Sequence, residues 1–391
     1  MRTTDLRLFA AITAISAFSV MGASFLAPFE VRFLGTLTKN PALVGMTFSV
    51  GAIFFALLSF ALGRLSVRVG KRRIVFLGTL LGIVYPLLYA ASASVFQYMG
   101  VKVVWAFSGA AMGPILMALL QDTLENNTNK GRALGIFHSA GALAGSFGAF
   151  LGGYASETLG FITAYRLESV IFIMPALISI AFLGTRDSQK SHSAGPKRSI
   201  FFAVKYLTRR PALRFHLILQ TAFAMSWHMK PILFILSIYA LSESYILAGS
   251  IFASMGVVAM IALPIVGSVI DKTGFLPGAK AAYVILGISS LGLALSPGIY
   301  IFWAFAVLYA LGEAINGPMR NVIEMENIES KYRGEILGFY SVYDSVIAAI
   351  SPLMAGALLL YYGPQEIIVF YSALLWSGLL IGIRVLNTTK K

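Results

Sequence analysis

The sequence contains no cysteine, which excludes disulfide bonds, thiolate catalysis and Cys-ligated metal sites. Charged residues are also scarce, at 12% of the chain against roughly a quarter in soluble domains. Neither a G-x-x-x-x-G-K-[ST] phosphate-binding loop nor an H-E-x-x-H zinc motif occurs. The four histidines are scattered along the chain, at His138, His192, His216 and His228. We therefore expect neither an enzyme nor a bound cofactor or metal.

Hydrophobic residues make up 58% of the chain and gather in long apolar stretches. A helix of about 20 such residues, rising ~1.5 Å per residue, crosses the ~30 Å hydrocarbon core of a bilayer. The stretches predict an all-α membrane protein with twelve transmembrane helices, near 8–29, 42–62, 74–92, 96–120, 133–156, 163–184, 212–240, 246–269, 280–296, 299–323, 335–361 and 366–386.

The net charge of +14 is distributed as membrane topology predicts. If the N-terminus is cytosolic, the outer loops hold only Arg32 and Lys39 of the 30 Lys and Arg residues, and nearly all others lie in cytosolic segments. Cytosolic loops carry such an excess of positive charge, so both termini are expected to be cytosolic and the protein to lie in the cell membrane. Nucleic-acid binding is not expected, because the charge forms no basic domain or groove.

The second half of the chain repeats the first. A polar segment, 185–211, separates six predicted spans from six, so that residues 1–184 and 212–391 are predicted to form two pseudo-symmetric six-helix bundles. A shift of 204 positions places residues 43–70 on residues 247–274 and matches Leu43/Leu247, Gly45/Gly249, Phe48/Phe252, Gly63/Gly267, Gly70/Gly274 and Gly113/Gly317. Two related bundles around a site near the bilayer midplane are typical of secondary transporters.

The loop after the second span, GRLSVRVGKRR at 63–73, resembles the G-x-x-x-D-R-x-G-R-R loop of the major facilitator superfamily. Its repeat copy, GSVIDKTG, lies at 267–274. Together with the twelve spans, the duplication and the central loop, the resemblance covers essentially the whole chain. It implies the fold of that superfamily and secondary transport by alternating access.

The resemblance also implies a conformational latch on the cytosolic side. In the family, the acid of this loop contacts the start of the fifth or eleventh span; here Val67 replaces that acid in the first copy, and Asp271 keeps it in the second. We expect Arg64 or Arg68 to pair with Glu335, and Asp271 with Arg132. The alternative is that the basic cluster only fixes topology. The predicted latch comprises Gly63, Arg64, Arg68, Gly70, Arg72, Asp271, Arg132 and Glu335.

Glycines recur along the fifth span, at 135, 141, 145, 148, 152 and 153. They partly match the glycine-rich signature of exporters in the superfamily, although Ala144 and Ala149 replace a Gly and the Pro. Small residues at this spacing let helix backbones approach closely, so helix packing explains most of the pattern.

Ionisable residues inside a bilayer cost at least a few kcal/mol and usually face a cavity or a partner. Those predicted within spans are Lys102, His138, His228, Lys230, Glu313, Arg320 and Asp344, with Arg166 and Glu168 near an outer end. Lys102 lies within about two turns of the outer end, close enough for its ammonium group to snorkel to the interface. At ~1.5 Å per residue, Glu313 falls near the midplane, Lys230 about 6 Å outward, and Asp344 and Arg320 about 6 and 12 Å inward.

These depths predict two ion pairs, Lys230 with Glu313 and Arg320 with Asp344. An anionic solute that binds the cation of a pair would leave the acid without its partner, and the acid would then tend to take up a proton. This gives a physical route to proton-coupled symport. Glu313, Asp344 and Arg320 are thus predicted to couple protons. The predicted solute-binding residues are Lys230, His228, Asn316, Tyr343 and Trp227. A purely structural ion pair stays open for Lys230, as does a packed polar residue for His228.

The sequence as a whole favours a monomeric secondary transporter that moves a small polar or anionic organic solute together with protons. One elementary charge crossing ~100 mV supplies ~2.3 kcal/mol, enough for about a fifty-fold solute gradient. A proton-coupled multidrug efflux antiporter is the alternative within the class, and a transporter-derived membrane sensor or scaffold the alternative outside it.

Overall fold

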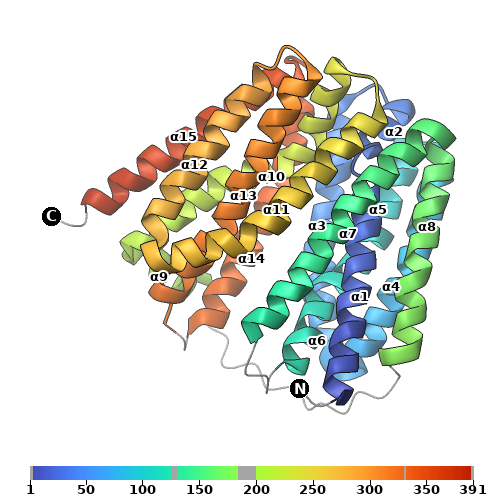
Figure 1. Cartoon of the computed structure of the whole chain (residues 1–391), viewed down its shortest axis with the longest axis horizontal. Coiled ribbons are helices and arrows are strands. Elements are labelled where there is room, and N and C mark those ends of the chain that lie inside the picture. The colour runs from blue at the N-terminus through green and yellow to red at the C-terminus, as the bar shows by residue number, and fades with distance from the viewer. Residues whose placement is uncertain (1–2, 125–129, 184–199, 330–331, 389–391) are drawn as a thin grey trace. The chain divides into compact units, whose positions relative to one another are not determined.

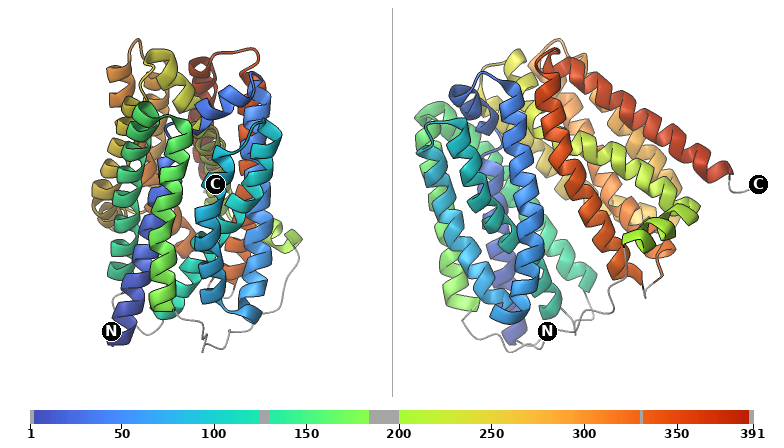
Figure 2. Two further views of the ribbon diagram at one scale, coloured as in Figure 1. Left: turned by 90° about the vertical axis from the view of Figure 1, so that its right-hand side faces the viewer. Right: turned by 180° about the vertical axis from the view of Figure 1, so that it is seen from behind.

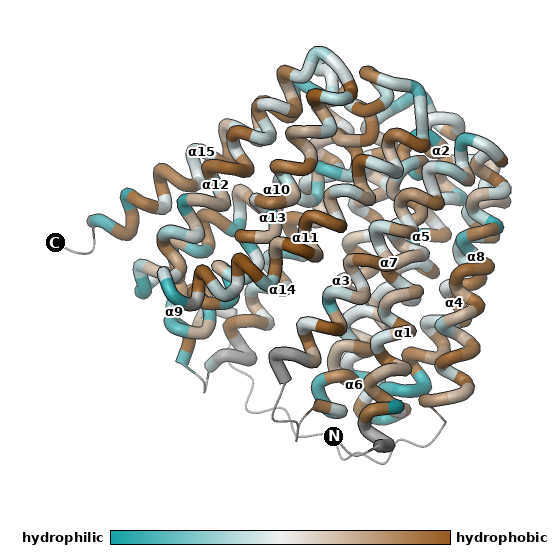
Figure 3. The backbone as a smooth tube through the Cα atoms, in the orientation of Figure 1, coloured by the Kyte–Doolittle hydropathy of each residue, from teal (hydrophilic) through white to brown (hydrophobic). Residues whose placement is uncertain are grey.

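The computed structural model describes residues 3–124, 130–183, 200–329 and 332–388. Side chains at 3–5, 130–132, 200–201, 271, 333–335 and 388 are outside the description. Twelve helices within these ranges are long and apolar enough to cross a membrane, as the sequence predicts. Figure 3 shows apolar residues along the length of the helices and polar residues gathered near their ends.

Contacts divide the chain into two compact units. Unit 1 comprises Met1–Ser191 and Ser244–Val257, and unit 2 comprises His192–Glu243 and Val258–Lys391. The helix α11 (Tyr245–Thr273) therefore contributes its first half to unit 1 and its second half to unit 2. The remaining elements of unit 1 are α1 (Thr3–Phe25), α2 (Glu30–Leu37), α3 (Pro41–Val69), α4 (Lys71–Ala90), α5 (Val95–Ala110), η1 (Ala111–Ile115), α6 (Leu116–Thr123), α7 (Lys130–Leu159), α8 (Phe161–Ile178) and η2 (Ser179–Leu183).

Two helices of unit 1, α3 and α5, begin at side-chain caps. At the start of α3, the Asn40 side chain accepts a hydrogen bond from the Ala42 backbone N–H at 3.0 Å, and Pro41 occupies the first helical position. At the start of α5, the Ser94 hydroxyl accepts one from the Gln97 N–H at 3.3 Å. The π-helical segment η1 interrupts the same span at Pro114, whose missing N–H cannot complete an α-helical ladder.

The glycines of α7 bring it into close contact with α1 and with the start of α11. A Cβ atom at Gly148 or Gly152 would overlap the backbone carbonyls of Met21 and Phe25 on α1, and one at Gly153 would overlap the Tyr245 carbonyl on α11. Figure 1 shows α1 and α7 side by side. The glycine pattern of the fifth span therefore serves helix packing, one of the two interpretations that its sequence allows.

Two glycines at repeat-equivalent positions make the loops of the recognised motif. Gly70, between α3 and α4, has φ of 102°, and Gly274, between α11 and α12 (Phe275–Ala294), has φ of 80°. Such positive φ values are costly for residues with a Cβ atom. Both motif copies thus make the same kind of tight turn.

In unit 2, α10 (Pro211–Leu241) contacts α13 (Ile299–Asn327), α14 (Arg333–Leu358) and α15 (Pro364–Thr388), and α12 packs against α13 and α15. The short helix α9, inside the predicted linker, packs against α10 and α14 (Figure 2). A tight contact joins α12 and α15, where a Cβ atom at Gly287 would overlap the Trp376 ring. The unit's elements beside α11 are α9 (Ile200–Arg209), α10 (Pro211–Leu241), α12 (Phe275–Ala294), α13 (Ile299–Asn327), α14 (Arg333–Leu358) and α15 (Pro364–Thr388).

Candidate functional site

Lys230 on α10 and Glu313 on α13 form an ion pair inside unit 2. The Lys230 Nζ donates to Glu313 Oε1 at 2.5 Å, and the two side chains are only 12% and 15% exposed. The ammonium also lies 3.9 Å from the centre of the Trp227 ring and 5.5 Å from that of Tyr309. Trp227 and Lys230 share one face of α10, and Tyr309 and Glu313 share one face of α13, because residues three or four apart are neighbours on a helix.

The cation of this pair is held by one carboxylate and by aromatic faces, which attract it through their quadrupoles. An anionic group of a solute that binds the ammonium would compete with Glu313 for it. Trp227, which is 42% exposed, gives the pair an accessible edge. Asn316 is buried one turn further along the same face of α13. The arrangement can therefore bind an anion next to an apolar ring, provided that the displaced Glu313 loses its charge.

A second polar cluster joins α10 to α14. The Gln220 Nε2 donates to Asp344 Oδ1 at 3.2 Å, and His228 Nε2 lies 3.4 Å from Asp344 Oδ2, within ion-pair distance although the angle makes no hydrogen bond. The hydroxyl groups of Thr221 and Tyr343 are hydrogen-bonded at 2.6 Å. Asp344 is 37% exposed at its side chain, so this acid is more accessible than Glu313.

Arg320 does not form the predicted ion pair with Asp344. Its Nε donates instead to Glu324 Oε1 at 2.8 Å, and His216 Nε2 lies 3.2 Å from the same oxygen. The physical reason is that Glu324, four residues along the same helix, already lies beside Arg320, whereas Asp344 is on another helix. Arg320 and Asp344 thus belong to two separate clusters, and their predicted role in proton coupling stays a prediction.

The structure describes only part of the predicted latch. Arg64 stacks over the Phe60 ring at 4.2 Å, the Arg72 guanidinium donates to the Leu183 carbonyl at 2.8 Å, and Arg68 is exposed. Lys71, in the same loop, pairs with Asp122 at 2.5 Å. The Arg72 and Lys71 contacts hold the start of α4 to η2 and α6, whereas Arg64 and Phe60 are both on α3. The Asp271, Arg132 and Glu335 side chains lie outside the described residues, so both latch pairs stay predictions.

Lys102, although close enough to the outer end to snorkel, does not do so. The residue is 2% exposed, and its Nζ donates to Glu30 Oε1 at 2.5 Å. The sequence gives no signal for Glu30, because it follows the first predicted span and so falls in a predicted outer loop, where an acid is common. Nothing in the sequence distinguishes Gln220, Thr221 and Tyr309 from the other polar and aromatic residues of the same spans. Glu324 carried a usable signal, namely an acid four residues after Arg320 on one helix.

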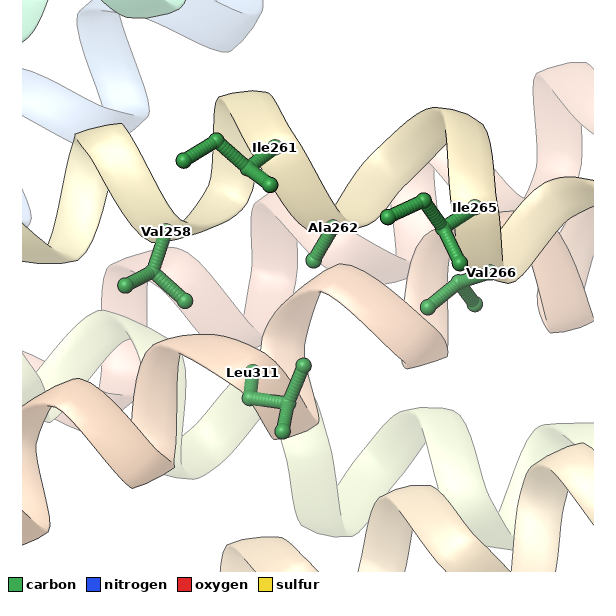
Figure 4. Close-up of a pocket in the computed structure, with 6 residues that line it drawn as sticks. All are labelled: Val258, Ile261, Ala262, Ile265, Val266 and Leu311. Atoms are coloured by element: carbon green, nitrogen blue, oxygen red, sulfur yellow. The ribbon is translucent and has the colours of Figure 1, made fainter.

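Two described pockets in unit 2 lie away from these clusters. One, of about 310 Å³, is lined only by apolar side chains of α11 and by Leu311 of α13 (Figure 4). Leu311 and Glu313 are two positions apart and so lie on nearly opposite faces of α13. The other, of about 550 Å³, includes Arg210 and Glu329, which pair with each other at 2.5 Å. Within the described ranges, no three His, Asp or Glu side chains are grouped to hold a metal ion.

Comparison with known proteins identifies similar transporters. The profile of the Major Facilitator Superfamily matches residues 10–352 and 244–390. The multi-drug resistance efflux pump PmrA of Streptococcus pneumoniae is 26% identical over 361 residues, which cover 88% of this chain and 86% of that protein. The multidrug resistance protein MdtG of Salmonella arizonae is 26% identical over 355 residues, which cover 86% of this chain and 84% of that protein.

Solved structures share the fold. A crystal structure of the nucleoside transporter NupG matches with a TM-score of 0.82 over 98% of this chain and 100% of that one. The sequence identity is 10%, so this likeness shows the fold alone. The fold predicted from the repeat and the loop motif is confirmed.

Proposed function

Because the chain belongs to the major facilitator superfamily, we propose that it is a secondary active transporter that moves a small anionic or polar organic solute by alternating access, coupled to protons. The observation that carries the proposal is the Lys230–Glu313 pair, since ionisable residues within membrane spans usually mark the path of a solute or ion. In this scheme the protein lies in the cell membrane with both ends of the chain in the cytosol. The solute crosses between the cytosol and the outside of the cell.

Lys230 and Glu313 divide the work between solute and proton. An anionic group binds the Lys230 ammonium, and the Trp227 ring packs against the solute's apolar part. Glu313, displaced from its cation in a poorly solvated position, takes up a proton from the side where the solute entered. When the solute leaves on the other side, Lys230 returns to Glu313 and the proton is released there. Solute and proton then cross together.

A thermal-shift screen of the purified protein against a metabolite library identifies the solute first, because a ligand that prefers the folded state raises its apparent stability. In proteoliposomes with an imposed pH gradient, Glu313→Gln is expected to abolish accumulation of that solute but to retain its counterflow. Lys230→Ala is expected to lose both. Glu326→Gln, an exposed acid on the same helix, and Lys280→Ala, an exposed lysine on α12, serve as controls that keep both activities.

The second candidate function, proton-coupled multidrug efflux, is favoured by the names of the similar proteins PmrA and MdtG. The aromatic side chains of Phe223, Trp227 and Tyr309 near an acid would suit an amphipathic cation. Lys230→Ala distinguishes the two functions: it abolishes uptake of carboxylates in the first and spares export of cationic dyes in the second. Accumulation of the solute by Glu313→Gln to the wild-type level would refute proton coupling at that residue.

A further inference from the structure

Unit 1 contains a buried polar cluster that the proposed transport cycle does not use. Its members come from α2, α4, α5 and α8, and each is at most 9% exposed. They are two acids, one lysine and four tyrosines, and we name them the Glu168 cluster: Glu30, Tyr85, Tyr89, Tyr98, Lys102, Tyr165 and Glu168.

In one half of the cluster, Glu30 and Lys102 form an ion pair that has further polar and aromatic contacts. Glu30 Oε1 accepts from Lys102 Nζ at 2.5 Å and from the Tyr98 hydroxyl at 2.7 Å. The Tyr98 hydroxyl also lies 3.1 Å from that of Tyr165. The ammonium lies 4.8 Å from the ring centres of both Phe48 and Trp105. One positive and one negative charge therefore balance each other here.

Glu168 has far less support. Its side chain is 0% exposed, and Oε1 accepts one hydrogen bond, from the Tyr85 hydroxyl at 2.7 Å. Oε2 is buried with no hydrogen-bond partner, and within the described residues no cation lies at ion-pair distance. An ionised carboxylate in this position would lack both a counter-ion and a second donor, which is the costliest state for a buried acid.

We propose that the Glu168 carboxyl group is a proton-binding site, separate from Glu313, that holds its proton as long as Lys102 is paired with Glu30. One lysine can neutralise only one of the two acids, so the other carries a proton. Opening of the Glu30–Lys102 pair lets the ammonium act on Glu168, whose proton then leaves, while Glu30 takes up a proton in its place. Use of this proton in transport rests on the proposed function; its presence on Glu168 does not.

The groups that face Glu168 from neighbouring elements are consistent with this assignment. α4 contributes Tyr85 and Tyr89, and Glu30 of α2 and Lys102 of α5 are near enough to act on Glu168 electrostatically. α1 and α7 also pack against α8, and neither brings a described titratable side chain to Glu168. The Tyr89 hydroxyl, like Glu168 Oε2, is buried without a described hydrogen-bond partner. Two groups in the cluster can therefore still form a hydrogen bond.

Infrared spectroscopy of the whole protein in a maltoside detergent, which has no ester carbonyl groups, tests the assignment without any transported solute. At neutral pH, the spectrum is expected to contain the carbonyl stretching band of a protonated carboxylic acid. Glu168→Gln, nearly the same in shape, should remove it. Glu157→Gln is the matched control in unit 1, because Glu157 is an exposed carboxylate that accepts hydrogen bonds from Ser244 and Ile246, and it should leave the band intact.

Two further variants test the geometry. Tyr85→Phe removes the hydrogen bond to Glu168 and should move the band to higher frequency without abolishing it. Lys102→Met removes the shared cation, so that both acids become protonated and the band roughly doubles in intensity. An unchanged band in Glu168→Gln would overturn the proposal. If Glu168→Gln removes the band while Glu313→Gln leaves proton-driven accumulation intact, the proton site stands and the proposed coupling at Glu313 fails.

Discussion

Some ionisable residues within the predicted spans of this chain form ion pairs with residues of other helices. Lys230 and Glu313 could be singled out from the sequence because few ionisable residues interrupt the predicted spans, and the structure pairs them at 2.5 Å. Lys102 could be singled out in the same way, but its partner Glu30 could not, because Glu30 lies just beyond the end of the first predicted span. Helical spacing predicts neighbours on one helix well, whereas contacts between helices depend on packing that one sequence does not reveal.

The Lys230–Glu313 pair should show strong coupling in stability. Breaking a buried pair by removing one partner leaves an uncompensated charge, so Lys230→Met and Glu313→Leu are each expected to lower the free energy of unfolding by about 3 kcal/mol. The double variant should regain much of that loss, because it buries no unpaired charge. Unfolding in mixed detergent micelles, followed by circular dichroism, measures the cycle. Additive losses in the double variant would show that the two residues do not stabilise each other.

Helices and turns were predicted more completely than side-chain contacts. Long apolar stretches located the twelve spans, and the repeated glycines located both motif turns, at Gly70 and Gly274. The short helices α2 and α9 were not predicted. Neither is long enough to resemble a span, and both lie in segments that the sequence predicts as loops. The π-helical segment at Pro114 also escaped prediction, since proline in a membrane helix is compatible with several local geometries.

The contact between α1 and α7 makes a testable claim about glycine. Gly152→Ala places a methyl group against the Phe25 carbonyl. Because the methyl is fixed to the backbone of α7 and the carbonyl belongs to that of α1, the helices must separate. We expect a loss of several degrees in thermal unfolding temperature. Gly135→Ala, on the same helix with nothing within 4 Å of its added Cβ, should be neutral or stabilising by up to about 1 kcal/mol. Equal effects of the two substitutions would contradict the observed packing.

At the scale of the whole molecule, the absence of cysteine and the distribution of charge allow topology to be measured directly. Single cysteines introduced at Lys39 and Arg209, both exposed, supply unique labelling sites. With the termini in the cytosol, Lys39→Cys should react with a membrane-impermeant maleimide on intact cells, and Arg209→Cys only after permeabilisation. The reverse pattern would invert the proposed orientation and, with it, the side on which each proton is taken up.

The duplication and the loop motif were sufficient to predict the fold, because the repeat relates the two halves of the chain and a copy of the loop occurs in each half. The solute was not predictable in the same way, since binding depends on a few side chains whose partners lie far away in sequence. Thr221 and Tyr343, for example, are joined by a hydrogen bond across 122 positions of sequence.

The indole ring against the Lys230 ammonium also has an optical consequence. The chain has four tryptophans, so replacing Trp105, Trp303 and Trp376 with phenylalanine leaves Trp227 as the sole indole fluorophore. Its emission depends on the charge 3.9 Å from its ring. Any molecule that draws that ammonium away would change the colour of the emitted light, so that occupancy of the ion pair could be followed in real time, without a radioactive solute or an attached dye.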